Sequence, residues 1–364
     1  MSLAIKTYEG IRTLRDDPGL LNLAWTLDER AQLSLDLDEL LSTSLRAEIE
    51  GDLAHINRYL VKDPYGEEAL RPAVAAHFAL SETSFEVSCG AGVASLLAAL
   101  ANLPQARTVR VLGDVYPDFP FWIQRSGGSC PAPSAEARAG RPSIVFLERP
   151  SLTGDGHAAL SDVVELCREA ASIGAIVIID ESNANYYPPA FSAVSLVPTH
   201  ENLLVLRGVS KAYQLGGLRL GYAVGSAQVT RDVRSVLPPL LTASLSLRLA
   251  DLVLRSGDVA APLRQKIAAN KAIAIRLLHD AGVSAAEPAS QYLPYVFVRG
   301  EARSESAFLE SRGVRGKLHP VWSASAGGVH HLYRLSAPLD DRRMELLREK
   351  LSSPGGGGAS EGSC

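Results

Sequence analysis

The sequence predicts an α/β protein in which a mostly parallel sheet lies between helices, with a smaller α+β domain after it. Short apolar runs alternate with longer amphipathic segments along most of the chain, and this pattern changes from about residue 264 onward. Hydrophobic residues make up 46% of the 364 residues, which is enough for a large core. Continuous apolar strands separated by helices are typical of a parallel sheet that is covered on both faces.

The strands of the first part are predicted from apolar runs that are too short to be helices. A short strand comes first and four buried strands follow, at residues 85–87, 108–112, 143–147, 175–179 and 203–206. Residues 160–172 are predicted to form a helix, because the segment has a polar start and Gly174 follows its end. Sheets of this kind bind ligands beyond the carboxyl ends of their strands, so we expect the chemistry just after these runs.

The remaining elements suit a smaller α+β domain. A long helix, a strand, a helix, a short strand and a closing helix are expected at residues 265–281, 292–298, 304–313, 332–336 and 340–351. The chain is therefore divided into an arm that joins the small domain, a large domain, the small domain and a flexible glycine-rich tail, at residues 1–30, 31–260, 261–352 and 353–364.

Composition narrows the class of partner. The net charge is −4 and 21% of the residues are charged, so neither a nucleic-acid-binding face nor a membrane partner is expected. No apolar run is long enough to span a bilayer, and the first residues lack the order of a signal peptide. The four cysteines have no paired spacing, which favours reduced thiols and a cytoplasmic location. The histidines are not at metal-ligand spacing, and no metal is expected.

Lys211 is the residue with the most specific surroundings. It lies in the segment 210–222, SKAYQLGGLRLGY, directly after a predicted strand. A lysine amine can form a Schiff base with a carbonyl, and Ser210 and Arg219 can hold a phosphate. Pyridoxal 5′-phosphate (PLP) is both an aldehyde and a phosphate monoester, so the segment predicts a PLP site. The alternative interpretation is a surface loop in which both charged side chains face water.

Asp180 follows a very apolar strand and is the second candidate. A carboxylate there can pair with a protonated pyridine nitrogen and so keep the ring an electron sink. A helix cap or, with Glu181, a metal-ligating pair are the alternatives, and the spacing to Lys211 favours the pyridine partner.

Three weaker features follow the same logic. Small residues around Ala91 and Gly92 come between a strand and a helix, where exposed N–H groups can bind an anion. Tyr116, or else Phe119, can stack on the pyridine ring, although ordinary packing at a turn is an equal alternative for either. Arg334 can hold a carboxylate through two parallel hydrogen bonds, and its alternative is a solvated residue of an edge strand.

Together these features resemble the PLP-dependent aminotransferases of fold type I, class I/II, from about residue 57 to about residue 351. The sequence is similar in particular to histidinol-phosphate aminotransferases and to threonine-phosphate decarboxylases. The resemblance implies the three-layer PLP-transferase fold and catalytic roles for Lys211, Asp180 and Tyr116. It also implies a homodimer with shared sites, because Tyr59 of an Asn-Arg-Tyr segment would reach the cofactor phosphate of the neighbouring subunit.

The resemblance further assigns the remaining contacts. Ala91 and Gly92 match the phosphate-binding backbone, Arg219 the phosphate arginine and Arg334 the carboxylate arginine, and Trp25 lies in a segment like the family's substrate-covering arm. An ordinary packing role for Trp25 is an equal alternative.

Two positions depart from the family pattern. Ser151 stands where the family has the asparagine of Asn-Pro-Thr-Gly, and Asn183 stands where it has the tyrosine of Asp-x-x-Tyr. Both family residues donate to the phenolic oxygen of the cofactor, and Ser151 and Asn183 are expected to donate in their place.

The function predicted is therefore an aminotransferase that acts on an amino acid through a Lys211 Schiff base. Because Ser151 and Asn183 are unusual, a PLP-dependent decarboxylase, lyase or cyclase of specialised metabolism is the alternative. A non-enzymatic regulatory domain that binds PLP is the third hypothesis, which the absence of a basic patch disfavours.

Overall fold

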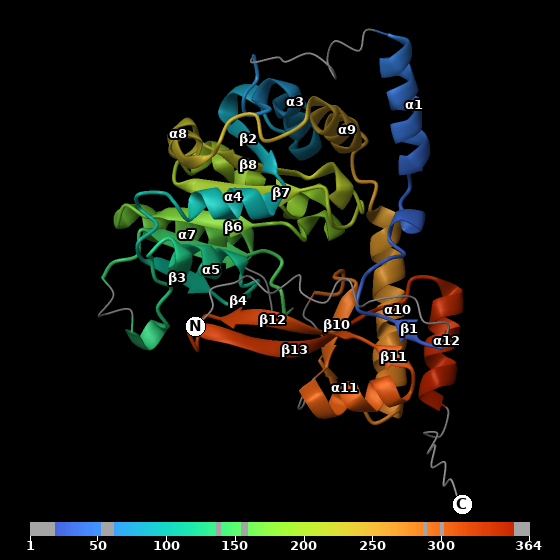
Figure 1. Ribbon diagram of the computed structural model, residues 1–364. Helices are drawn as coiled ribbons and strands as arrows, with labels where there is room; N and C mark the ends of the chain where they lie inside the picture. Colours follow the sequence, from blue (N-terminus) through green and yellow to red (C-terminus); the bar gives the residue numbers. More distant parts are fainter. Residues whose placement is uncertain are drawn as a thin grey trace, which may run out of the picture.

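The computed structural model describes residues 19–51, 62–135, 140–153, 159–286, 290–298 and 302–352. Figure 1 shows two sheets with their helices, the larger sheet in the upper part of the view and the smaller one below it. The α-helices of the described chain are α1 (Leu37–Glu50), α3 (Glu67–Phe78), α4 (Val93–Leu100), α5 (Asp118–Arg125), α7 (Leu160–Ser172), α8 (Ala227–Val236), α9 (Ser244–Arg255), α10 (Ala261–Asp280), α11 (Ala302–Ser311) and α12 (Asp341–Ser352).

The larger sheet has six strands, and the mostly parallel arrangement predicted from the sequence is confirmed. Strands β3, β5, β6 and β7 are parallel, and β8 runs antiparallel to both of its neighbours. Across the sheet the order is β2 (Glu86–Ala91), β8 (Leu220–Gly225), β7 (Leu203–Gly208), β6 (Ile176–Asp180), β5 (Ile144–Glu148) and β3 (Val109–Leu112).

Both faces of this sheet are buried, which explains why its central strands are apolar without alternation. In β6, Val177 and Ile179 pack with residues of α3, α7 and α9, whereas Ile176 and Ile178 pack with residues of α4, α5 and α8. Side chains of consecutive strand residues point to opposite faces, so each face needs its own apolar set. The result is a layer of helices on each side of the sheet.

The smaller sheet has five strands, and all of its pairs are antiparallel. Its order is β4 (Asp114–Val115), β12 (Lys317–Ser323), β13 (Gly328–Ser336), β10 (Tyr295–Val298) and β9 (Ala285–Ala286). Because β4 follows β3 in the chain, the segment that leaves the larger sheet continues directly into the smaller one. Near the N-terminus, β1 (Leu21–Asn22) pairs in parallel with β11 (Val314–Arg315).

Most predicted elements are present, with shifted ends. Helix α7 has the predicted bounds, and α10, α11 and α12 lie within four residues of theirs. Strand β13 is longer than expected, and the strands β8 and β12 and the two-residue strands β1, β4, β9 and β11 were not predicted. The predicted tail lies outside the described residues.

Glu181, directly after β6, is the centre of a buried polar cluster. Its carboxylate is fully buried and pairs with Arg149 (Nη1 to Oε1, 3.1 Å) and Arg207 (Nη1 to Oε2, 3.0 Å). Ser192 and the backbone N–H of Ala193 also donate to it. Three successive parallel strands are therefore joined at their carboxyl ends by one anion and two cations.

Replacing Glu181 by alanine should destabilise the fold strongly, because two buried guanidinium groups would lose their counter-charge. We expect a loss of about 3–5 kcal/mol in the free energy of unfolding, measured by denaturant titration. The matched control is Glu165→Ala, which removes an exposed pair with Arg168 and should cost less than about 1 kcal/mol. Equal losses in the two variants would contradict the central role of the cluster.

Candidate active site

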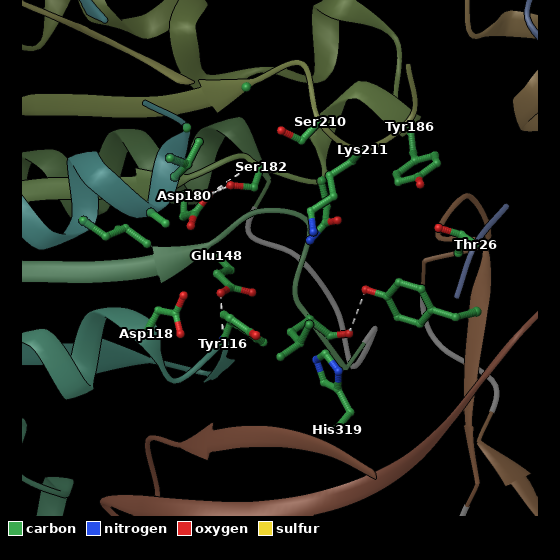
Figure 2. Close-up of a pocket in the computed structure, with 18 of the residues that line it drawn as sticks. Thr26, Tyr116, Asp118, Glu148, Asp180, Ser182, Tyr186, Ser210, Lys211 and His319 are labelled. Atoms are coloured by element: carbon green, nitrogen blue, oxygen red, sulfur yellow. Dashed lines mark hydrogen bonds between the residues drawn. The ribbon is translucent and has the colours of Figure 1, made fainter. Parts of the chain in front are cut away.

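A cavity of about 350 Å³ opens at the carboxyl ends of the parallel strands, between the two sheets (Figure 2). Strand ends, the start of α4, the β12–β13 hairpin and the N-terminal segment all contribute to its wall. Its lining includes nine residues singled out from the sequence: Trp25, Gly92, Tyr116, Asp180, Asn183, Ser210, Lys211, Arg219 and Arg334.

Lys211 follows β7 and projects into the cavity (Figure 2). Its side chain is exposed, and it lines this cavity. Burial and then the nearby Arg334 lower the pKa of the Lys211 amine, while Asp180 acts in the opposite direction. A lysine with a lowered pKa holds more of the neutral amine that attacks a carbonyl.

Gly92 and Arg219 lie side by side in the cavity wall and form a cradle there. Gly92 precedes α4 with φ +81°, and a Cβ built there would lie 2.6 Å from Nη2 of Arg219. Arg219 is itself fixed by hydrogen bonds from Nη1 to the Gly216 carbonyl (3.1 Å) and from Nη2 to the Ala91 carbonyl (3.4 Å). A guanidinium beside the start of a helix fits a phosphate group, and only glycine leaves room for it.

Asp180 ends β6 and is buried, at 7% exposure. Its Oδ1 accepts hydrogen bonds from the Ser182 backbone N–H (2.8 Å) and hydroxyl (2.5 Å). Burial raises the pKa of Asp180, whereas the Ser182 donors and Lys211 lower it. The cavity therefore contains a carboxylate suited to a cationic ring nitrogen, which together with the phosphate cradle and Lys211 fits PLP.

Glu148 is a cavity residue that the sequence analysis did not identify. It ends β5, lies opposite Asp180 in the parallel register, and accepts a hydrogen bond at Oε1 from the Tyr116 backbone N–H (2.7 Å). Its place at the end of an apolar strand, like that of Asp180, was the available signal. The strand was expected to end one residue earlier, so Glu148 was assigned to the loop.

Arg334 and Lys317 form a cationic pair on the β12–β13 hairpin. They lie opposite each other in the antiparallel register, and both line the cavity. Arg334 donates from Nη2 to the Ala24 carbonyl (2.9 Å), and the Nζ of Lys317 lies 4.1 Å from the centroid of the Trp25 ring. Within the described ranges, no carboxylate forms an ion pair with either side chain.

Burial, Arg334 and Lys211 lower the pKa of Lys317 to about 7. Nearby, His319 is buried with both ring nitrogens lacking hydrogen-bond partners within the described structure, and its ring lies 5.5 Å from that of Tyr116. Burial and neighbouring cations lower the pKa of His319 well below its usual value, so its imidazole is neutral. His319 was not assigned to the site from the sequence, because strand β12 was not predicted.

The N-terminal segment forms one wall of the cavity and is fastened to several elements. Glu29 is buried and accepts hydrogen bonds from the Tyr186 hydroxyl (3.1 Å) and from Gln214, which follows Lys211. Asp28 pairs with Arg343 of α12 through both carboxylate oxygens. These contacts hold Trp25 and Thr26 against the cavity.

Three predicted site residues are not in the cavity wall as described. Ser151 does not line it, and Leu152 does instead. Ala91, the residue before Gly92, does not line the cavity, and its carbonyl accepts a hydrogen bond from Arg219. Tyr59 lies outside the described residues. Asn183 lines the cavity, so of the two replacements expected at the phenolic oxygen, only Asn183 is in the wall.

No helix in the described parts of the chain has the length and apolar character needed to cross a membrane. Likewise, among the described side chains there is no cluster of three or more His, Cys, Asp or Glu residues that could hold a metal ion.

Comparison with known proteins agrees with the geometry. The family model for aminotransferase class I and II matches residues 135–319. Histidinol-phosphate aminotransferase 2 of Archaeoglobus fulgidus is 26% identical over 306 residues, which cover 80% of this chain and 85% of the relative.

Two solved structures share the fold. Histidinol-phosphate aminotransferase from Sinorhizobium meliloti, in complex with pyridoxal-5′-phosphate, has a TM-score of 0.64 at 22% identity, covering 85% of this chain and 86% of that one. L-threonine-O-3-phosphate decarboxylase from Porphyromonas gingivalis has a TM-score of 0.67 at 15% identity, covering 91% and 98%. The fold is thus that of the fold type I PLP enzymes. The chain belongs to the family of class I and II aminotransferases, and its cofactor is pyridoxal 5′-phosphate.

Proposed function

We propose that the cavity is the active site of an aminotransferase that acts on an acidic amino acid or an amino acid phosphate. The observation that carries this proposal is the meeting of four groups in one cavity: the Lys211 amine, the Asp180 carboxylate, the Gly92–Arg219 cradle and the Arg334–Lys317 pair. Each suits a different part of the cofactor or substrate.

The chain's own residues account for cofactor binding. Arg219, Ser210 and the N–H groups at the start of α4 would hold the phosphate, Asp180 the ring nitrogen, and the Tyr116 ring would pack on the pyridine plane. When bound, PLP supplies an aldehyde that captures an amine and a protonated ring that withdraws electrons from it. Asn183, in the loop after β6, lines the same cavity and is our candidate hydrogen-bond donor to the phenolic oxygen of the cofactor.

Lys211 is proposed to move the proton at the substrate. Burial and Arg334 lower the pKa of Lys211. Its amine can therefore accept a proton from the substrate Cα and donate it to C4′ of the cofactor. A general base works best when its pKa is near the working pH, and the Asp180 carboxylate keeps the pKa of Lys211 from falling further.

Arg334 and Lys317 are proposed to hold the substrate's acidic groups. Arg334 suits the α-carboxylate, because a guanidinium can bind a carboxylate through two hydrogen bonds. Lys317, at the register position opposite, suits a second anion, and Trp25 and His319 would line the space between. A buried cation without a counter-charge is costly, and a bound anion removes that cost.

The division of the chain and its assembly are also proposals. We infer an N-terminal arm, a large domain and a small domain within residues 1–30, 31–260 and 261–352, a division supported by the two separate sheets. A cytoplasmic homodimer is proposed as well, and exposed apolar side chains, including Ile49 of α1 (63%) and Leu240 (41%), support the association of two chains.

The direct test is borohydride treatment of the protein isolated with its cofactor, followed by peptide mapping. The cofactor should become fixed to Lys211 and not to Lys317, the other cavity lysine with a lowered pKa. Lys211→Ala should retain weaker cofactor binding and lose at least about 10²–10⁴-fold of turnover, since its proton transfer is removed. Unchanged turnover in Lys211→Ala would remove the assignment.

Product analysis separates transamination from decarboxylation. Incubation with a panel of acidic amino acids should give a keto acid and the amine form of the cofactor in equal amounts. Release of carbon dioxide with retention of the amine would replace the proposal by a decarboxylase, the kind of enzyme that one of the similar solved structures is.

Lys317 should titrate near neutrality. Apoprotein reductively methylated with isotope-labelled formaldehyde should show, by NMR, a lysine midpoint at about pH 7 that is absent from Lys317→Met. Burial also lowers the pKa of Lys271 to about 7, and any midpoint from Lys271 should remain in the variant. The unfolded chain keeps this proton up to its ordinary pKa of 10.5, so this group makes the folded state more stable as the pH rises from about 7 toward 10.5. Glutarate should raise the midpoint. A midpoint at the ordinary value would contradict the buried position.

A further inference from the structure

Glu148 is a buried carboxyl group for which the reaction proposed above has no role. It is 9% exposed and lines the cavity between Asp180 and Tyr116 (Figure 2). Oε1 accepts the 2.7 Å hydrogen bond from the Tyr116 backbone N–H. Oε2 is buried and has no hydrogen-bond partner among the described residues. An unpartnered buried oxygen at a cavity wall is a group that a ligand can satisfy.

The groups that face Glu148 favour its neutral form. Asp180 on β6 and Asp118 on α5 are negative neighbours, and Lys211 after β7 is the positive one. Burial and then Asp180 raise the pKa of Glu148 well above its ordinary value, more than the Tyr116 N–H and Lys211 lower it. Two carboxyl groups on adjacent strand ends cannot both ionise cheaply in a buried site. Asp180 is the one that stays ionised, because Ser182 donates to it twice.

The order of the strands indicates which part of the cofactor Glu148 faces. The phosphate cradle is built at β2 and β8, Asp180 ends β6, and Glu148 ends β5 on the far side of Asp180. In PLP the phosphate arm and the phenolic hydroxyl lie on opposite sides of the axis through the ring nitrogen. If the cradle takes the phosphate and Asp180 the nitrogen, the hydroxyl side is the Glu148 side. This step rests on the proposed function.

We propose that Glu148 is a neutral carboxylic acid whose Oε2 donates a hydrogen bond to the phenolic oxygen of the bound cofactor. Ser151, expected from the sequence to make this contact, does not line the cavity, whereas Glu148 does. A carboxylic acid kept neutral by its surroundings is a strong donor to an anionic oxygen. Glu148 is thus a cofactor-binding residue, and its proton is part of the site before the cofactor arrives.

The first experiment detects that proton without cofactor or turnover. Infrared difference spectra of the apoprotein at neutral pH, wild type minus Glu148→Gln, should contain the carbonyl band of a protonated carboxylic acid that shifts in heavy water. Asp118→Asn is the matched control from the same cavity and should retain the band. Absence of the band from the wild type, or its loss only in Asp118→Asn, would overturn the proposal.

The second experiment measures equilibrium binding of PLP and of an analogue without the ring hydroxyl. Glu148→Leu should weaken PLP binding about tenfold or more, as expected for a lost hydrogen bond to a charged group. Glu148→Gln keeps a neutral donor and should stay within a few-fold of the wild type. Neither substitution should change the affinity for the analogue without the ring hydroxyl. Equal losses in both variants, equal losses for both ligands, or no loss at all would overturn the proposal.

The two proposals fail separately. Circular dichroism and thermal unfolding of each variant exclude misfolding as the cause of a change, and the infrared experiment needs only the conservative Glu148→Gln protein. If borohydride fixes cofactor on Lys211 but the carboxylic acid band is missing, the Glu148 proposal fails and the proposed function stands. If Lys211 is not labelled, the proposed function fails, while the band still reports the protonation of Glu148.

Discussion

The ion pairs of Glu181 with Arg149 and Arg207 are the constraint on which the cavity depends. Arg149 directly follows Glu148, Glu181 directly follows Asp180, and Arg207 lies in the strand that leads to Lys211. Consecutive residues point in different directions at these strand ends, so one of each pair faces the cluster and the other faces the cavity. The cluster thereby fixes the relative positions of the two carboxyl groups and the lysine.

The distribution of charge inside the cavity follows from the two sheets. The carboxyl groups Asp118, Glu148 and Asp180 come from the larger sheet and its connections, whereas Arg334 and Lys317 come from the smaller sheet. Lys211 lies between these two sets, and Arg334 lowers its pKa whereas Asp180 raises it. A zwitterionic ligand with its cationic part toward the first set and its anionic part toward the second would meet complementary charge at both ends.

Much of this arrangement could be predicted from the sequence, because it is encoded locally. Asp180 and Lys211 each follow a continuous apolar run, Arg219 belongs to the same short segment as Lys211, and Gly92 comes between a strand and a helix. The fold class and the family resemblance were confirmed for the same reason. The roles of individual residues stay predictions until they are measured.

The remaining features of the site could not be predicted, because they depend on the residue at which a strand ends and on which side chains of the β12–β13 hairpin face the cavity. Glu148 was missed because β5 continues one residue further than expected, and Ser151 was chosen by its position in a motif although Leu152 takes the wall. Strand β12 carries alternating polar and apolar residues around a proline and gives no apolar run, so the inward direction of Lys317 and His319 follows only from its pairing with β13.

The wall formed by the N-terminal segment has a mechanical consequence. Strand β1 pairs with β11, the Ala24 carbonyl accepts a hydrogen bond from Arg334 of the smaller sheet, and Glu29 accepts one from Gln214 in the loop after β7. Because this short segment is bonded both to the smaller sheet and to the loop after β7, a hinge movement of one sheet against the other would strain it. If a ligand entered past the N-terminal segment, the hydrogen bond of Glu29 with Gln214 or that of Ala24 with Arg334 would first have to break. The strength of these two hydrogen bonds therefore sets the energy needed for opening.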